Sequence, residues 1–269
     1  MKKLLAAAAG VLALCALAGW AEKPGAARPE RAEKPIMVGH RGSDVGLENS
    51  VESFTAGALR GYDYLETDWR LTADSQFVCS HDDSTTRLGG TLAIASSTLA
   101  QLQAEPLRQT RGGQTYTGRL CSAKEYLDVC RRHGVKPHIE LKWATGINSK
   151  DCSNIPLLIK FIEENGVRDS CIILTSMRPC LEYIREHYPD IKLQFLTGKY
   201  QRAHADWAIA NGLDVDIMRG CFDSTDLERY HRAGLKVNVW TVNSTADSLR
   251  YTDTIPCDYI TTDRLMPAR

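Results

Sequence analysis

Short apolar segments alternate with segments of helical periodicity along most of the chain, and this alternation limits the possible folds more than any other feature. Each apolar segment has the length of one strand. A stretch of about ten residues with helical spacing of its apolar side chains follows most of them. A strand that is followed by a helix and then by another strand usually runs parallel to that next strand. The sequence therefore predicts a parallel sheet with crossover helices.

The alternation repeats about eight times, which is typical of a (β/α)8 TIM barrel. The predicted strands are 36–38, 62–71, 136–141, 171–174, 191–196, 215–218, 235–242 and 259–261, with a further short strand at 76–80. The predicted helices are 50–60, 122–133, 155–165, 180–187, 204–210, 224–233 and 245–251. A doubly wound sheet is the alternative, but no Gly-x-Gly-x-x-Gly turn follows the first strand.

Residues 82–118, which follow the second strand region, do not share this alternation. They contain Gly89-Gly90 and Gly112-Gly113, runs of Thr and Ser, and one short helix near 98–103. Glycine pairs and small polar residues are typical of turns and loops. We interpret this segment as a short irregular insertion in the barrel.

The composition is that of an ordinary globular protein, with 43% hydrophobic and 25% charged residues among 269. The 33 Lys and Arg residues balance the 33 Asp and Glu residues. This neutral total gives no reason to expect a nucleic acid as partner. A small anionic substrate needs only local positive charge, so it remains compatible with the composition.

The N-terminus has the pattern of a signal peptide. Lys2 and Lys3 precede an apolar stretch at 4–18, and small residues follow it. We expect a signal peptide at 1–21, a flexible leader at 22–35 and a barrel domain at 36–269, with an uncleaved anchor as the alternative. The chain would then be exported, either periplasmic or secreted, without a stable membrane span after cleavage. Lipidation at Cys15 is not expected, because Leu14 stands where a small residue is needed.

Eight of the nine cysteines lie outside this signal. They are Cys79, Cys121, Cys130, Cys152, Cys171, Cys180, Cys221 and Cys257. An even number of cysteines in an exported chain favours disulfides, and we expect two or more, although the pairing cannot be deduced from the sequence. The alternative is that several are small buried apolar residues.

Three carboxylates occur at or near the ends of predicted strands. Glu66 and Asp68 are two residues apart in one strand, so they share a face, and Glu140 ends another strand. The carboxyl ends of barrel strands meet at one mouth, so the three should converge there. Carboxylates crowded in one cavity repel unless a cation lies among them, and oxygen ligands suit Mg²⁺ or Ca²⁺.

Two cations and two histidines accompany these carboxylates. Arg41 follows the first strand and Lys142 follows Glu140, and both residue types bind phosphate oxygens. His40 and His81 also follow strands, and imidazole groups suit general acid–base catalysis near neutral pH. This set of residues predicts metal-assisted attack on a phosphodiester.

The motifs, taken in order, resemble those of the glycerophosphodiester phosphodiesterase family. The matching segments are His40-Arg41-Gly42, Leu47-Glu48-Asn49-Ser50, Glu66-Thr67-Asp68, Thr72-Ala73-Asp74-Ser75, His81-Asp82, Glu140-Leu141-Lys142, Val239-Trp240-Thr241-Val242-Asn243 and Thr262-Asp263. The similarity runs from about residue 36 to residue 265. Three positions depart from the family pattern, namely Leu47, Ser50 and Ser75, and none of them is a proposed ligand.

The resemblance implies a barrel with one divalent cation, held by the residues matching Glu66, Asp68 and Glu140. It implies that His40 and His81 form the acid–base pair, and that Trp240 packs on the glycerol side of the pocket. The implied substrate is a small glycerophosphodiester such as glycerophosphocholine or glycerophosphoethanolamine. Its own hydroxyl attacks phosphorus and expels the alcohol, and water then opens the cyclic phosphate to give glycerol 3-phosphate.

Several readings remain open at the level of the sequence. Glu48 and Asn49 either cap the helix that follows or orient the metal and Arg41 from behind. Lys142 contacts phosphate or forms a salt bridge to the carboxylates, Trp240 either lines the pocket or packs in the barrel, and His138 is expected in the core. For the whole chain, the alternatives are phospholipase C- or D-like action on lipids or lysolipids, and a non-catalytic module that binds phosphorylated polyols.

Overall fold

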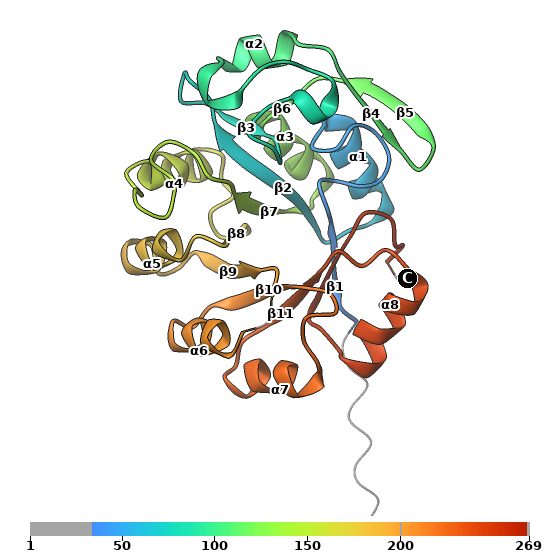
Figure 1. The fold of residues 1–269 in the computed structure, drawn as a ribbon, viewed down its shortest axis with the longest axis vertical. Helices are drawn as coiled ribbons and strands as arrows, with labels where there is room; N and C mark the ends of the chain where they lie inside the picture. Colours follow the sequence, from blue (N-terminus) through green and yellow to red (C-terminus); the bar gives the residue numbers. More distant parts are fainter. Residues whose placement is uncertain (1–33, 200, 268–269) are drawn as a thin grey trace, which may run out of the picture. The chain divides into compact units, whose positions relative to one another are not determined.

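The computed structural model describes residues 34–199 and 201–267, and eight parallel strands form a closed barrel within them (Figure 1). The strands are β1 Ile36–Gly39, β2 Tyr64–Leu71, β7 Lys136–Leu141, β8 Ile172–Thr175, β9 Lys192–Thr197, β10 Asp214–Met218, β11 Val237–Trp240 and β12 Tyr259–Thr262. β1 pairs with both β12 and β2, and these pairings close the sheet. The (β/α)8 barrel is therefore confirmed, and the doubly wound alternative is wrong.

Helices lie around the outside of the barrel (Figure 1). They are α1 Val51–Arg60, α3 Ala123–His133, α4 Ile155–Glu164, α5 Arg178–His187, α6 Arg202–Ala210, α7 Ser224–Arg232 and α8 Thr245–Leu249, which a short π-helix, Arg250–Thr254, continues. Their boundaries follow local chemistry. Ser122 caps the N-terminus of α3 in a capping box with Glu125, and Gly134 ends this helix with φ 67°. None of the helices in the described residues is long and apolar enough to cross a bilayer.

The insertion is more regular than the sequence predicts. It contains two 3₁₀ turns, Thr86–Leu88 and Ile94–Ser96, helix α2 Leu99–Ala104, and a hairpin of β4 Leu107–Arg111 and β5 Gln114–Gly118. Gly112 and Gly113 form the hairpin turn with φ 57° and 83°, a conformation that favours glycine. The predicted strand 76–80 is β3 Phe77–Cys79, but it runs antiparallel to β2 and pairs with β6 Cys121–Ser122, so it lies outside the barrel.

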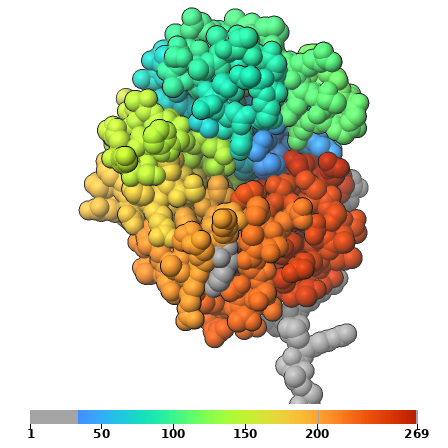
Figure 2. Space-filling view, viewed as in Figure 1, coloured from blue at the N-terminus to red at the C-terminus, as the bar shows by residue number. Residues whose placement is uncertain are grey.

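Three clusters of buried apolar residues support these elements, and the smallest consists of the barrel-strand residues Val38, Tyr64, Ile172 and Tyr259. The large core lies between the barrel strands and the outer helices, and it includes Leu65, Ile139 and Ile173. A smaller core lies beneath the insertion and includes Leu102 and Leu107. The space-filling view shows green residues close to blue residues and to the red C-terminal elements (Figure 2), and Arg111 of the hairpin contacts Ser43 and Asp263. The insertion is thus packed onto the barrel next to the ends of β1 and β12.

The predicted disulfides are not confirmed. All eight cysteines in the described residues are free, and six of them are buried. The sulfur atoms of Cys152 and Cys180 lie 3.5 Å apart, which is longer than a disulfide bond. Burial, together with the nearby Cys152, raises the pKa of Cys180 to about 12. These cysteines therefore pack as small apolar residues, the alternative that the sequence left open.

The barrel interior contains a buried histidine that should make stability depend on pH. His138 is inaccessible to solvent, its Nε2 lies 2.9 Å from Gln194 Oε1, and burial lowers its pKa from 6.5 to about 4. As pH falls below 6.5, the unfolded chain takes up a proton that the folded chain does not. The folded state should therefore lose stability between pH 6.5 and 4, by about 3 kcal/mol from this residue.

Replacing His138 with glutamine should remove this contribution, because an amide keeps a polar group at the position and does not titrate. Urea unfolding of both proteins across this pH range measures the difference. The free energy of unfolding should fall more steeply with acid in the wild type than in His138→Gln. Parallel pH curves for the two proteins would contradict this prediction.

Candidate active site

The carboxyl ends of the barrel strands surround a cavity of about 100 Å³, and most of the predicted site residues line it. These residues are His40, Arg41, Glu66, His81, Glu140, Lys142 and Trp240. The remaining three predicted residues, Glu48, Asn49 and Asp68, are buried behind this lining. The parallel register explains the convergence, because it brings the ends of all barrel strands to one mouth.

Glu66, Asp68 and Glu140 form a cluster of carboxylates in which one oxygen of each lies within 4.8 Å of the others. Asp68 stands beside Glu140 in the register of β2 and β7. Burial raises the pKa of Glu66 well above its usual value, and the charges of Asp68 and Glu140 raise it further. Burial and the charge of Asp68 raise the pKa of Glu140 to about 7. Because these charges repel, the cluster fits a divalent cation bound through oxygen atoms.

Lys142 and Arg41 place positive charge against this cluster. The Lys142 Nζ atom lies 2.7 Å from Glu140 Oε1 and 3.1 Å from Asp68 Oδ1. The Arg41 backbone N–H donates to Glu66 Oε2 at 2.8 Å, and its Nε lies 3.5 Å from Asp68 Oδ2. Burial alone would raise the pKa of Asp68, but Lys142 and Arg41 hold it well below its usual value. Both cations therefore pair with carboxylates and also line the cavity.

Each of the two histidines is oriented by a carboxylate. The Nδ1 atom of His40 lies 3.0 Å from Asp263 Oδ1, and the Nδ1 atom of His81 lies 2.7 Å from Asp82 Oδ1. A ring whose Nδ1–H donates to a carboxylate has its Nε2 available for proton transfer. Burial lowers the pKa of His81, while the Asp68 charge opposes this effect. Two carboxylate-oriented imidazoles thus line the same cavity.

Glu48 orients arginines and does not cap a helix. It accepts hydrogen bonds from Arg41 Nη1 at 3.0 Å, from Arg87 Nη1 at 3.1 Å and from Gln109 Nε2 at 2.6 Å. Burial alone would raise the pKa of Glu48. Hydrogen bonding to Arg87 and the nearby arginine charges instead lower this pKa to about 2. The carboxylate is therefore ionised at neutral pH and fixes the guanidinium of Arg41 at the cavity wall.

Asn49 orients a member of the carboxylate cluster. Its Nδ2 donates to Asp68 Oδ2 at 2.8 Å, and its Oδ1 accepts from the Thr67 hydroxyl at 2.9 Å. Its backbone has φ 55°, a left-handed conformation that asparagine tolerates better than most residues. Ser50, and not Asn49, caps α1, because its side chain accepts from the Ser53 backbone N–H. Of the two roles left open for Glu48 and Asn49, orientation of the site fits the contacts.

Four further residues belong to the site but received no role from the sequence. Asp263 orients His40 and Asp82 orients His81. The two aspartates belong to the motifs Thr262-Asp263 and His81-Asp82, so the sequence pattern could have identified them as site residues. Arg87 contacts both Asp82 and Glu48. Asp216 of β10 lines the cavity, is buried, and has no hydrogen-bond partner for its Oδ1 atom. Burial raises the pKa of Asp216 well above its usual value.

The described geometry agrees with a match to a known family. The model of the glycerophosphoryl diester phosphodiesterase family matches residues 40–266. The chain belongs to this family. The predicted enzyme class, a phosphodiester hydrolase with a TIM barrel, is thereby confirmed. Family members generally depend on a divalent metal, and the cluster of Glu66, Asp68 and Glu140 could hold one.

Solved structures of family members share the barrel. A phosphodiesterase of Oleispira antarctica, solved in complex with the product sn-glycerol-3-phosphate, is 20% identical, with 87% of this chain and 94% of that chain covered and a TM-score of 0.74. The glycerophosphodiester phosphodiesterase of Thermotoga maritima is 19% identical, with coverage of 86% and 95% and a TM-score of 0.68. A glycerophosphoryl diester phosphodiesterase of Parabacteroides distasonis is 20% identical, with coverage of 88% and 85% and a TM-score of 0.68. No curated protein matches the chain significantly.

Proposed function

We propose that this phosphodiesterase hydrolyses small glycerophosphodiesters to an alcohol and glycerol 3-phosphate. One observation carries the proposal. A single cavity is lined by two histidines that are each held by a carboxylate, by two cations and by a carboxylate cluster that fits a divalent cation. The Oleispira antarctica structure, whose ligand is sn-glycerol-3-phosphate, supports a substrate of this size and chemistry.

In the proposed first step, the substrate's own hydroxyl attacks phosphorus and forms a cyclic phosphate. One imidazole of the pair His40 and His81 takes the proton of this hydroxyl, and the other gives a proton to the departing alcohol as its bond to phosphorus breaks. In the second step water attacks phosphorus and opens the ring, with the two imidazoles in exchanged roles. Arg41 and Lys142 bind phosphate oxygens throughout.

We propose that Glu66, Asp68 and Glu140 hold one Mg²⁺ or Ca²⁺ ion. Such an ion supplies positive charge to a phosphoryl oxygen and lowers the pKa of the attacking hydroxyl. The chain's own contribution is to keep the three carboxylates together against their repulsion, which the Asn49 amide and the Lys142 ammonium do through Asp68. Trp240 is proposed to pack on the glycerol part of the substrate.

The test is release of glycerol 3-phosphate from a panel of glycerophosphocholine, glycerophosphoethanolamine and glycerophosphoinositol. Each assay is run with Mg²⁺, with Ca²⁺ and with an excess of chelator. We expect release with at least one substrate and one ion, and no release with chelator. Absence of release from all substrates with both ions, in protein shown to be folded, would overturn the proposal.

Removing the Asn49 amide should weaken metal binding without changing any ligand. Asn49→Gly deletes the hydrogen bond to Asp68 and still accommodates φ 55°. We therefore expect the metal affinity to fall about tenfold. Asn49→Ala deletes the same bond and adds backbone strain, so it should also lower the unfolding temperature. Calorimetric titration with Mg²⁺ and Ca²⁺ measures the first effect. Equal metal affinity in Asn49→Gly and wild type would assign Asn49 to folding alone.

We also propose that the chain is exported, on the basis of residues 1–21 alone. These residues and 22–33 of the leader lie outside the described part of the structure, so the support is the sequence pattern. The mass of the protein recovered from outside the cytoplasm of producing cells tests this proposal. Recovery of the full-length mass in the cytoplasmic fraction only would contradict it.

A further inference from the structure

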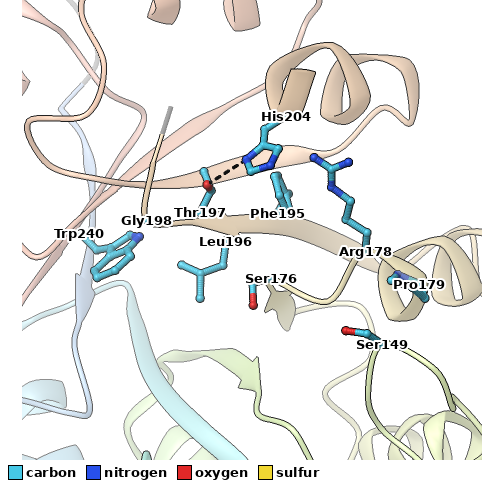
Figure 3. Close-up of a pocket in the computed structure, with 10 residues that line it drawn as sticks. All are labelled: Ser149, Ser176, Arg178, Pro179, Phe195, Leu196, Thr197, Gly198, His204 and Trp240. Atoms are coloured by element: carbon cyan, nitrogen blue, oxygen red, sulfur yellow. Dashed lines mark hydrogen bonds between the residues drawn. The ribbon is translucent and has the colours of Figure 1, made fainter. Parts of the chain in front are cut away.

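A larger hollow adjoins the catalytic cavity at the same mouth of the barrel. It has a volume of about 490 Å³ and shares two wall residues with the cavity, Leu196 and Trp240 (Figure 3). Its other walls come from the end of β9 and from the segments that follow β7, β8 and β9. A diester held by its phosphate in the smaller cavity carries two groups esterified to phosphorus. The hollow is therefore placed to receive the group that the smaller cavity does not hold.

Among the described residues that line the hollow, the polar groups include a cation and an imidazole but no carboxylate. Arg178 and His204 provide the cation and the imidazole, and Ser149, Ser176 and Thr197 provide hydroxyl groups. Figure 3 shows the guanidinium end of Arg178 next to the ring of His204, with Trp240 on the opposite side of Leu196. A positively charged ligand would find no opposite charge among these walls.

Arg178, at the wall of the hollow, stacks on two aromatic rings. Its guanidinium carbon lies 4.6 Å from the centre of the Trp207 ring and 5.4 Å from that of Phe195, distances at which a cation is attracted to an aromatic face. Its Nη2 atom is buried and has no hydrogen-bond partner. No ion pair of Arg178 with a carboxylate is found within the described ranges, 34–199 and 201–267, although Glu182, four residues later in α5, accepts from Nε1 of the Trp207 ring on which Arg178 stacks.

His204 adds a second group that an anion would satisfy. Its Nδ1 atom lies 3.5 Å from the Thr197 hydroxyl oxygen, and Figure 3 draws this contact at the upper wall. Burial and the charge of Arg178 both lower the pKa of His204, so the two groups are close enough to interact. Arg178 and His204 thus converge on one end of the hollow, where a negatively charged oxygen could accept from both.

We propose that this hollow, the Arg178 pocket, binds the leaving alcohol of the diester and selects an alcohol that carries a negative charge. The inference rests on the proposed function and adds to it the chemical class of the leaving group. A phosphorylated polyol is such an alcohol. Choline and ethanolamine carry positive charge and would meet Arg178 without a carboxylate to offset it. The Trp240 face could attract such a cation, whereas the Phe195 ring already lies beside the Arg178 guanidinium.

The experiment compares two substrates that differ only in one phosphate group, glycerophosphoinositol 4-phosphate and glycerophosphoinositol. For the wild type, kcat/KM should be about tenfold higher for the phosphorylated substrate, mainly through a lower KM, since a charge-assisted hydrogen bond contributes to binding. In Arg178→Met, which keeps an unbranched side chain beside Phe195 and Trp207, this ratio should fall to about one. Arg178→Lys keeps the charge without the planar fork and should give an intermediate ratio.

Arg132→Met is the matched control, because it removes one exposed arginine charge from α3, away from the pocket walls, and should keep the wild-type ratio. A binding measurement separates this inference from the proposed function. Calorimetry with the His40→Ala variant should show the same preference for the phosphorylated compound, and its loss in His40→Ala/Arg178→Met, whether or not turnover occurs.

The possible results are distinct. If the wild type releases glycerol 3-phosphate but treats both substrates equally, or prefers glycerophosphocholine to both, the Arg178 pocket does not select an anion and the inference is overturned. A preference that survives in Arg178→Met overturns it as well. If no substrate is hydrolysed, the proposed function fails, and the binding preference in the His40→Ala background still decides the inference.

Discussion

Replacing His40 with alanine is expected to lower kcat roughly 10³-fold, because proton transfer by a positioned imidazole contributes about that factor. The Nδ1 atom of His40 lies 3.0 Å from Asp263 Oδ1, so the ring is already oriented before substrate binds. The KM should change much less, because phosphate is bound by Arg41 and Lys142. Steady-state kinetics of glycerol 3-phosphate release measures both constants.

The control for this variant is His187→Ala, which removes an exposed histidine near the end of α5. It should keep the wild-type kcat, since His187 contacts Tyr183 and lies away from the cavity. Asp263→Asn should also lower kcat, but by less than His40→Ala, because the imidazole stays in the cavity while the amide no longer favours the Nδ1–H tautomer. A His40→Ala enzyme that retains the wild-type kcat would exclude His40 from proton transfer.

The second large effect is expected for Glu66→Gln, which should abolish the response to metal and with it the activity. The amide keeps the size of the side chain and an oxygen that can accept from the Arg41 backbone N–H, so the local fold should persist. Without metal, the variant should be at least as stable as the wild type, because one of three mutually repelling carboxylates is gone. Adding metal should then stabilise only the wild type.

Thermal unfolding with and without Mg²⁺ or Ca²⁺ measures this difference. At a metal concentration 100-fold above its dissociation constant, binding stabilises a folded protein by about 2.7 kcal/mol, which gives a visible shift in the unfolding temperature. Glu186→Gln, at an exposed position in α5, is the control and should show the full shift. If metal raises the unfolding temperature of Glu66→Gln as much as that of the wild type, Glu66 is not a metal ligand.

The barrel was predictable from the sequence because its strands are short apolar segments with helices between them. The hairpin of β4 and β5 was not, because all its residues except the buried Leu107 are exposed or partly exposed and carry little apolar signal. Only the Gly112-Gly113 turn marked it. The strand at Phe77–Cys79 had an apolar pattern, but this pattern does not distinguish an antiparallel strand outside the barrel from a parallel one within it.

For the site, the sequence predicted most of the residues that line the cavity, although not Asp216, and of the groups that hold them it indicated only Glu48 and Asn49, as one of two readings. The residues that line it end strands or follow them closely, and the fold alone brings such positions together. The carboxylate that orients His40 is 223 residues away along the chain, and the guanidinium of Arg87 meets Glu48 across 39 residues. No local spacing encodes such pairings. The cysteines were misjudged for a similar reason, since burial and not the number of cysteines decides their state.

The hairpin contacts two of the groups that orient the site. Gln109 of β4 donates to Glu48 and accepts from its backbone N–H, and Arg111 of the same strand lies 3.3 Å from Asp263. The residues that hold Arg41 and His40 therefore depend on a surface segment that departs from the regular barrel. In an evolving lineage, a change in the length of this hairpin would alter catalytic rate even though none of its residues lines the cavity. The length of the hairpin is then constrained by the catalytic reaction, as are the residues of the barrel that line the cavity.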